Sequence, residues 1–122
     1  MSNKVIPVLR IFDYAKAVEF YISWLGFTID WEHRFEDDLP LYMQISKDDI
    51  ILHLSEHHGD CCLGAKVFIE YKALQTYHTL LSEKKYKYNR PGLEHAPWNA
   101  ITMEVTDPFG NKLLFSEKNS DA

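Results

Sequence analysis

Apolar and polar positions in the first half of the chain follow two different periods. Residues 4–12, KVIPVLRIF, are mostly apolar and β-branched, which predicts a strand. Pro7 cannot donate a backbone hydrogen bond, so we expect this strand to lie at a sheet edge or to contain a bulge. Apolar residues then recur at helical spacing between Asp13, a residue typical of helix N-caps, and Gly26, a residue typical of helix ends. The chain therefore begins with a strand and a helix.

Three more strands complete this half. Residues 27–35 alternate strictly between two kinds of position, the pattern of a half-exposed strand. One face of that strand is predicted to carry Phe27, Ile29, Trp31, His33 and Phe35. Residues 41–46 and 50–55 flank a short polar turn, which predicts a β-hairpin.

The same order begins again after a loop at residues 56–65. The second half is predicted to contain a strand at 66–71, a helix at 73–85, a loop with a short strand at 89–98, and strands at 100–106 and 112–117. One side of this helix is predicted to carry Leu74, Tyr77, Leu80 and Leu81. Each half thus repeats the order of one strand, one helix and three strands.

This repetition predicts an α+β fold built from two βαβββ modules. One module alone has a single helix and a short sheet, which is too little to close a core. We expect a single domain over residues 1–122, with module one at about 4–55 and module two at about 66–117. The modules would form a curved mixed sheet around a cup, with the helices on its outer face. Concave surfaces of this kind bind ligands.

Composition narrows the class of ligand. The formal net charge is −5 at pH 7, which argues against nucleic acid and anionic membrane surfaces as partners and favours cationic or neutral small molecules. The two cysteines, Cys61 and Cys62, are adjacent, and neighbouring residues rarely satisfy disulfide geometry. The N-terminal residues lack the apolar core of a signal peptide, and no apolar run approaches a membrane span. We therefore expect a cytoplasmic protein.

Three stretches resemble a known family. They are PVLRIFDYAKAVEFYISWLGF at 7–27, LHLSEHHGDCCLGAKVFIE at 52–70, and PW followed by TDPFGNKLLFSE within 97–117. All three resemble the glyoxalase / bleomycin resistance protein superfamily, whose fold is called the vicinal oxygen chelate fold. The resemblance implies paired βαβββ modules assembled as a homodimer. It also implies one of two activities: some members are metalloenzymes, such as glyoxalase I, extradiol dioxygenases and fosfomycin-modifying thiol transferases, whereas bleomycin resistance proteins only sequester a bulky cationic glycopeptide in grooves at the dimer interface.

The resemblance places the metal ligands of enzymatic members at four strand positions. In this chain those positions fall at Ile6-Pro7, at His53, near Val67 and at Leu114. Only His53 can bind a metal, whereas a catalytic metal needs at least three protein ligands. The sequence therefore predicts no metal, no cofactor and no catalytic residue.

The loop at 56–65 offers a second, separate set of metal-binding elements. It contains His57, His58, Asp60 and the two cysteines, Cys61 and Cys62. Adjacent side chains point in divergent directions, whereas structural zinc prefers spaced pairs. We expect an exposed turn here, with a metal site or ligand contact by His57 or His58 as the alternatives.

Aromatic residues on or beside the predicted strands give the stronger functional signal. We predict that the ligand is bound by Trp98, Tyr42, His53, Trp31, Phe35 and Glu104. Aromatic rings can stack on a flat ligand and attract a cation through their faces. Five nearby acids would also attract a cation: Asp30, Glu32, Glu36, Asp37 and Asp38. Many members of the family have Gly where Asn99 follows Trp98, so this edge of the groove is expected to differ in shape.

These observations favour a metal-independent protein that binds and sequesters a small organic molecule. The expected ligand is a cationic, aromatic, bleomycin-like antibiotic, and the expected assembly is a homodimer. One alternative is a divalent-metal-dependent lyase or thiol transferase of the glyoxalase type, in which His53 and Glu104 would take part. Another alternative is a dimer with a regulatory or structural role.

Overall fold

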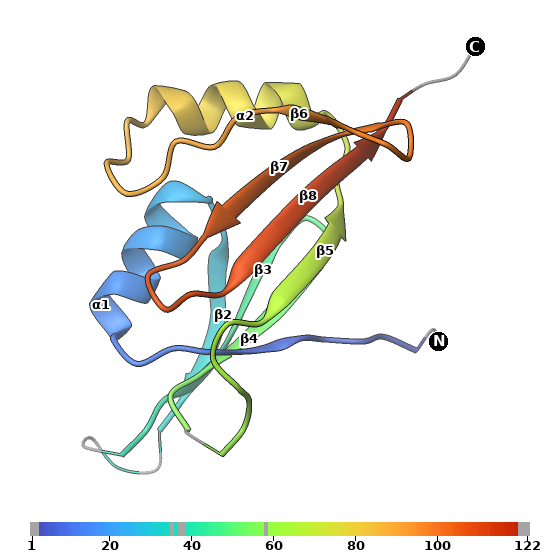
Figure 1. Cartoon of the computed structure of the whole chain (residues 1–122). Coiled ribbons are helices and arrows are strands. Elements are labelled where there is room, and N and C mark those ends of the chain that lie inside the picture. The colour runs from blue at the N-terminus through green and yellow to red at the C-terminus, as the bar shows by residue number, and fades with distance from the viewer. Residues whose placement is uncertain (1–2, 35, 37–38, 58, 120–122) are drawn as a thin grey trace. The chain divides into compact units, whose positions relative to one another are not determined.

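The computed structural model describes residues 3–34, 36, 39–57 and 59–119 (Figure 1). The chain divides into two compact units. The first contains Met1–Ala65 together with Asp107–Asn111, and the second contains Lys66–Thr106 and Lys112–Ala122. No helix among the described residues is long and apolar enough to cross a membrane.

The first unit has the predicted order of one strand, one helical segment and three strands. Its elements are β1 (Val8–Arg10), α1 (Tyr14–Ala17), η1 (Val18–Trp24), β2 (Thr28–His33), β3 (Tyr42–Lys47) and β4 (Ile50–Ser55). The strands form a mixed sheet in the order β1-β4-β3-β2, in which β1 pairs with β4 in parallel and the other pairs are antiparallel. β1 is shorter than the predicted strand at 4–12, and it lies at the sheet edge, as the proline in that stretch predicts.

The predicted helix begins and ends at the expected residues. The Asp13 carboxylate accepts a hydrogen bond from the backbone N–H of Lys16, at 3.1 Å, and so caps the helix. Gly26 follows the helix with a φ of +89°, which glycine adopts without steric cost. The second part, η1, is a π-helix, in which Leu25 N–H donates to the Phe20 carbonyl five residues earlier. Helical spacing alone does not predict this wider turn.

The second unit repeats the topology of the first. Its elements are β5 (Lys66–Glu70), α2 (Leu74–Glu83), β6 (Glu94–Ala96), β7 (Ala100–Thr106) and β8 (Lys112–Lys118). The sheet order is β5-β8-β7-β6, with β5 parallel to β8 and the remaining pairs antiparallel. Two open mixed sheets of identical order confirm the α+β fold of two βαβββ modules.

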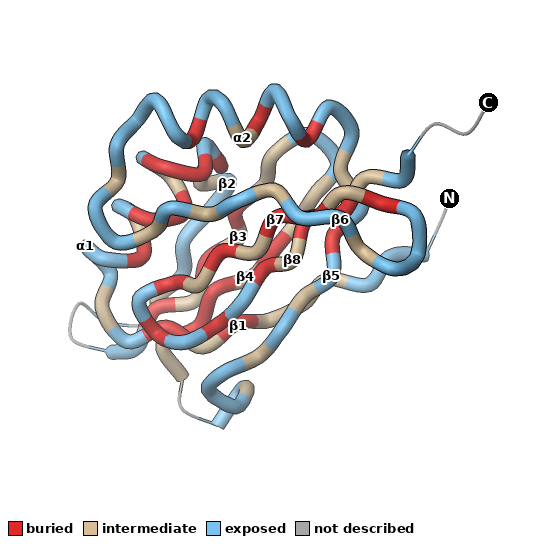
Figure 2. Tube along the Cα trace, turned by 45° about the horizontal axis from the view of Figure 1, so that its top comes forward, coloured by how far each residue is buried: buried red, intermediate tan, exposed pale blue. Residues whose placement is uncertain are grey.

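Buried residues recur along one side of α2, and β8 buries Leu113, Phe115 and Ser116 (Figure 2). Leu74, Tyr77 and Leu81 are buried, as predicted. Leu80, which helical spacing places with them, is 47% exposed at the edge of that side. Leu80 lies about 100° around the helix axis from Leu81.

The turn between β7 and β8 is held in the first unit by a buried polar cluster. The Asp107 carboxylate is 4% exposed and accepts a hydrogen bond from the Tyr21 hydroxyl at 2.6 Å. It also accepts from the backbone N–H groups of Phe109 and Asn111 and from the Asn111 side-chain amide. That amide donates a second bond to the Arg10 carbonyl at 2.8 Å. These hydrogen bonds give the buried polar groups of the turn their partners, and the bonds to Tyr21 and Arg10 hold the turn in place within the first unit.

Candidate functional site

The sheet of the first unit has one apolar face and one polar, aromatic face. Its apolar face buries Met43, Ile45, Leu52 and Leu54. His53 lies between two of these leucines on β4, so its side chain points to the opposite face. Gln44 on β3 is directly opposite His53 in the register, so both side chains belong to that second face.

A bulge in β2 adds Trp31 to this polar face. Ile29 pairs with Ile45, but Trp31 pairs with the adjacent Gln44, so Asp30 is an extra residue on β2. The extra residue reverses the alternation: Ile29 aligns with the apolar row, and Trp31 aligns with Gln44 and His53. The prediction that residues 27–35 alternate strictly, with Ile29 and Trp31 on one face, was therefore wrong.

Three predicted ligand-binding residues meet on this face. The Trp31 and Tyr42 rings are stacked, with centroids 6.0 Å apart and planes 12° from parallel. The His53 ring meets both edge-on, at 5.3 Å from Trp31 and 5.2 Å from Tyr42. Trp31 is 43% exposed, which leaves ring surface open to a ligand. We call these three residues the aromatic cluster.

A chain of hydrogen bonds runs beneath the aromatic cluster. The Gln44 amide nitrogen donates to Asp30 Oδ2 at 3.0 Å, and Gln44 Oε1 is 2.9 Å from His53 Nε2. His53 Nδ1 is in turn 2.7 Å from the Tyr42 hydroxyl. Ser46 donates a further bond to Asp30 Oδ1 at 2.9 Å. Both ring nitrogens of His53 are therefore engaged, and its ring orientation is fixed.

The loop after β4 approaches one end of this cluster. Its Asp60 carboxylate accepts a bond from the buried Ser55 hydroxyl at 2.6 Å, which fixes the start of the loop. Burial raises the pKa of the Tyr42 phenol, and the negative charges of Asp60 and Cys61 raise it further. Burial, followed by the charge of Asp60, likewise raises the pKa of the Cys61 thiol. His57 lies 6.5 Å from the Tyr42 ring, between centroids.

This loop holds two free thiols, Cys61 and Cys62. Among the residues that the structure describes, no group of three or more His, Cys, Asp or Glu side chains is arranged to hold a metal ion. His58, one of the predicted alternatives for ligand contact, lies outside the described residues.

The strand positions that would carry metal ligands do not fit a metal. In the first unit, His53 is directly opposite Val8 on β1, and both of its ring nitrogens are already engaged. In the second unit, the corresponding pair on β5 and β8 is Phe68 and Leu114. Valine, phenylalanine and leucine offer no lone pair, so these residues cannot form the three-ligand set of a catalytic metal site.

The second unit carries two other predicted ligand-binding residues, Trp98 and Glu104. Trp98 is 51% exposed, and its indole N–H lies 3.4 Å from the Ser116 hydroxyl. Its ring centroid is 6.4 Å from that of Phe68, which is also exposed. Glu104 forms an ion pair with Lys66 at 3.0 Å, with the Lys112 ammonium 4.0 Å from its other oxygen. Phe35, the remaining predicted residue, lies outside the described part of the chain, as do Asp37 and Asp38.

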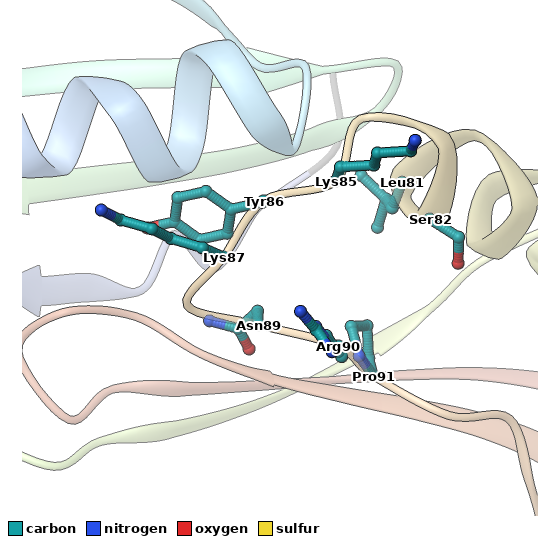
Figure 3. Close-up of a pocket in the computed structure, with 8 residues that line it drawn as sticks. All are labelled: Leu81, Ser82, Lys85, Tyr86, Lys87, Asn89, Arg90 and Pro91. Carbon is teal, nitrogen blue, oxygen red and sulfur yellow. The ribbon is translucent and has the colours of Figure 1, made fainter.

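A separate pocket of about 340 Å³ lies in the second unit (Figure 3). It is lined by Leu81, Ser82, Lys85, Tyr86, Lys87, Asn89, Arg90 and Pro91. The Asn89 amide donates to the Thr106 carbonyl at 2.8 Å and thus fixes the pocket's loop to β7. Its lysines follow the C-terminal end of α2, where cations complement the helix dipole. None of the residues predicted to bind a ligand lines this pocket.

Sequence reasoning missed Gln44 and Ser46 and treated Asp30 only as one of several nearby acids. The signal for Gln44 was its position: a polar residue between Met43 and Ile45 on a strand that faces His53 in the hairpin register. Asp30 could not be placed, because its role depends on the bulge.

Comparisons with known proteins agree with this fold. A family model described as glyoxalase superfamily protein matches residues 1–122. Solved structures with the same fold include a bleomycin-binding protein complexed with bleomycin, with 19% identity, a TM-score of 0.73, and coverage of 97% of this chain and 100% of that one. A bleomycin resistance determinant encoded on the transposon Tn5 has 18% identity, a TM-score of 0.76 and coverage of 98% and 100%. TnmS3, an antibiotic-binding protein from Streptomyces sp. CB03234, has 16% identity, a TM-score of 0.66 and coverage of 98% and 99%. No curated protein matches the chain.

Proposed function

The chain belongs to the glyoxalase superfamily, and from this premise we propose that it is a metal-independent protein that binds and sequesters a small, antibiotic-type organic molecule. The aromatic cluster of Trp31, Tyr42 and His53 carries this proposal. An exposed indole held parallel to a phenol offers a rigid flat surface for a ligand ring. Structures of the same fold are named as bleomycin-binding and antibiotic-binding proteins, which supports this class of ligand.

Charge supports a cationic ligand. Asp30 lies on the same face as the aromatic cluster and is held there by Ser46 and Gln44. Neither of these partners is charged, so the negative charge of the Asp30 carboxylate remains available to a cation. An indole face beside a carboxylate attracts a cation by two additive effects, the ring quadrupole and the full charge.

The alternative of a metal-dependent lyase or thiol transferase gains no support from these residues. His53, which would be the first ligand, uses both ring nitrogens in hydrogen bonds. Glu104, the acid expected to act with it, is held by Lys66. For this reason we assign the chain to the binding class.

Four further features belong to this proposal as predictions. We propose that Trp98, Phe35 and Glu104 also contact the ligand, that the two units form a single domain over residues 1–122, and that the protein is a homodimer in the cytoplasm. Sedimentation with and without ligand tests the dimer.

Calorimetric titration with metal-free bleomycin and with 9-aminoacridine, in the presence of a chelator, tests the proposal. We expect saturable binding of at least one of these two cations. Trp31→Ala should weaken binding roughly tenfold or more, because truncating an aromatic anchor typically costs about 2 kcal/mol. Tyr88→Ala is the matched control, since Tyr88 is an exposed aromatic residue outside the cluster. Equal binding by wild type and Trp31→Ala would contradict the proposed site.

A further inference from the structure

We infer that Asp30 and Gln44 are positioning residues that fix the hydrogen-bonding polarity of the aromatic cluster, so that the site selects ligands presenting N–H donors. This inference rests on the proposed function and specifies the chemistry of the ligand. It is carried by the direction of the hydrogen-bond chain from Asp30 to Tyr42.

Asp30 sets which group donates and which accepts in each hydrogen bond of this chain. A carboxylate only accepts hydrogen bonds, so the Gln44 group that faces it must be the amide NH₂. The Gln44 oxygen then faces His53 Nε2 at 2.9 Å. Two acceptors do not pair, so Nε2 must carry the hydrogen. Asp30 therefore determines, through Gln44, which nitrogen of His53 is protonated.

The same logic determines what Tyr42 does. In a neutral imidazole with hydrogen on Nε2, Nδ1 is an acceptor. The Tyr42 hydroxyl, 2.7 Å away, must then donate its only hydrogen to Nδ1. Burial raises the pKa of this phenol, which keeps that hydrogen in place at neutral pH. The phenol oxygen is left with lone pairs and no hydrogen to offer a ligand.

The cluster consequently presents acceptors beside a flat ring. The acceptors are the Tyr42 oxygen and the Asp30 carboxylate, whose oxygens each receive one bond from Gln44 or Ser46 and retain further lone pairs. A planar ring that carries an N–H donor, such as an amino-substituted heteroaromatic cation, complements both the indole of Trp31 and these oxygens. A planar ligand that presents only acceptors would cover these oxygens without pairing with them, and removing a polar group from water without giving it a partner is unfavourable.

Four acridines with the same ring system test this inference. 9-Aminoacridinium carries charge and N–H donors, 10-methylacridinium carries charge without an N–H, acridine is neutral, and acridine-9-carboxylate is an anion that only accepts. We expect 9-aminoacridinium to bind about five- to tenfold more tightly than 10-methylacridinium, which is the effect of roughly one hydrogen bond. Acridine-9-carboxylate should bind most weakly.

Gln44→Leu should reduce this preference, because it disconnects Asp30 from His53 while the Asp30 carboxylate keeps its bond from Ser46. Gln75→Leu is the matched control, since Gln75 is exposed on α2. Equal affinity of wild type for 9-aminoacridinium and 10-methylacridinium, or an unchanged preference in Gln44→Leu, would overturn the inference and leave the proposed function standing. If no acridine bound in a Trp31-dependent manner, the inference would be overturned, and if metal-free bleomycin also failed to bind, the proposed function would be overturned as well.

A measurement on the free protein keeps the inference testable if Gln44→Leu does not fold. Long-range ¹H–¹⁵N correlation spectra distinguish the two neutral tautomers of a histidine ring. We expect the neutral ring of wild-type His53 to carry its hydrogen on Nε2. A spectrum that shows hydrogen on Nδ1 of neutral His53 would overturn the inference.

Discussion

Removing the Tyr21 hydroxyl should lower the free energy of unfolding by the contribution of one buried hydrogen bond, which can be estimated from the structure. Tyr21 is fully buried, and its hydroxyl donates at 2.6 Å to the Asp107 carboxylate, which is 4% exposed. A hydrogen bond to a charged group contributes about 1.5–3 kcal/mol. Asp107 keeps three other donors from Phe109 and Asn111, so it is not left unpaired in Tyr21→Phe. We therefore expect a loss of about 2 kcal/mol in the free energy of unfolding.

Urea denaturation followed by circular dichroism and by tryptophan fluorescence measures this loss. Trp24 is buried in the same unit as Tyr21 and reports its unfolding. The urea midpoint should fall while the slope m stays unchanged, because the surface exposed on unfolding is the same. Tyr88→Phe, at a 65% exposed tyrosine, should change stability by less than about 0.5 kcal/mol. If Tyr21→Phe were as stable as wild type, the buried polar cluster would not hold the β7–β8 turn as we describe.

Three other predictions concern titration and charge. Burial, and then the neighbouring Asp107 carboxylate, raise the pKa of Tyr21, so its neutral form stabilises the fold fully below about pH 10 and that contribution is lost as the pH rises further. The free energy of unfolding of Tyr21→Phe should therefore fall less at alkaline pH than that of wild type, and an equal fall in both proteins would contradict this prediction. Because the pKa of Cys61 is raised while Cys62 is exposed, iodoacetamide should label Cys62 first at neutral pH, and faster labelling of Cys61 in the single-cysteine variants would refute this. Glu104→Gln should cost less than about 1 kcal/mol of stability in thermal melts, since its ion pair is partly exposed, and a larger loss would show a stronger role for that pair.

Local signals in the sequence were sufficient to predict the order of the strands and helices. The Asp13 cap and the turns between strands each depend on a few neighbouring residues, and the structure confirms them. Alternation along β4 was also sufficient to place His53 on the face opposite the leucines, because nothing interrupts that strand. The repetition of this order predicted two βαβββ modules, and the structure shows them as two four-stranded sheets of the same strand order.

Features that depend on pairing between strands could not be predicted in this way. The bulge at Asp30 shifts the register by one residue, so strict alternation assigned Ile29 and Trp31 to the same face. Gln44 gains its role only from its position opposite His53. Leu80 fits the helical spacing of its neighbours but is exposed at the edge of the buried side of α2, and helical spacing alone does not say where that edge falls.

The most direct test of the proposed function is calorimetric titration of chelator-treated protein with metal-free bleomycin and 9-aminoacridine, repeated with Trp31→Ala. We predict saturable binding of at least one of these cations without added metal, weakened roughly tenfold or more by Trp31→Ala. Binding that required a divalent metal, or that was identical in Trp31→Ala, would contradict a metal-independent site at the aromatic cluster.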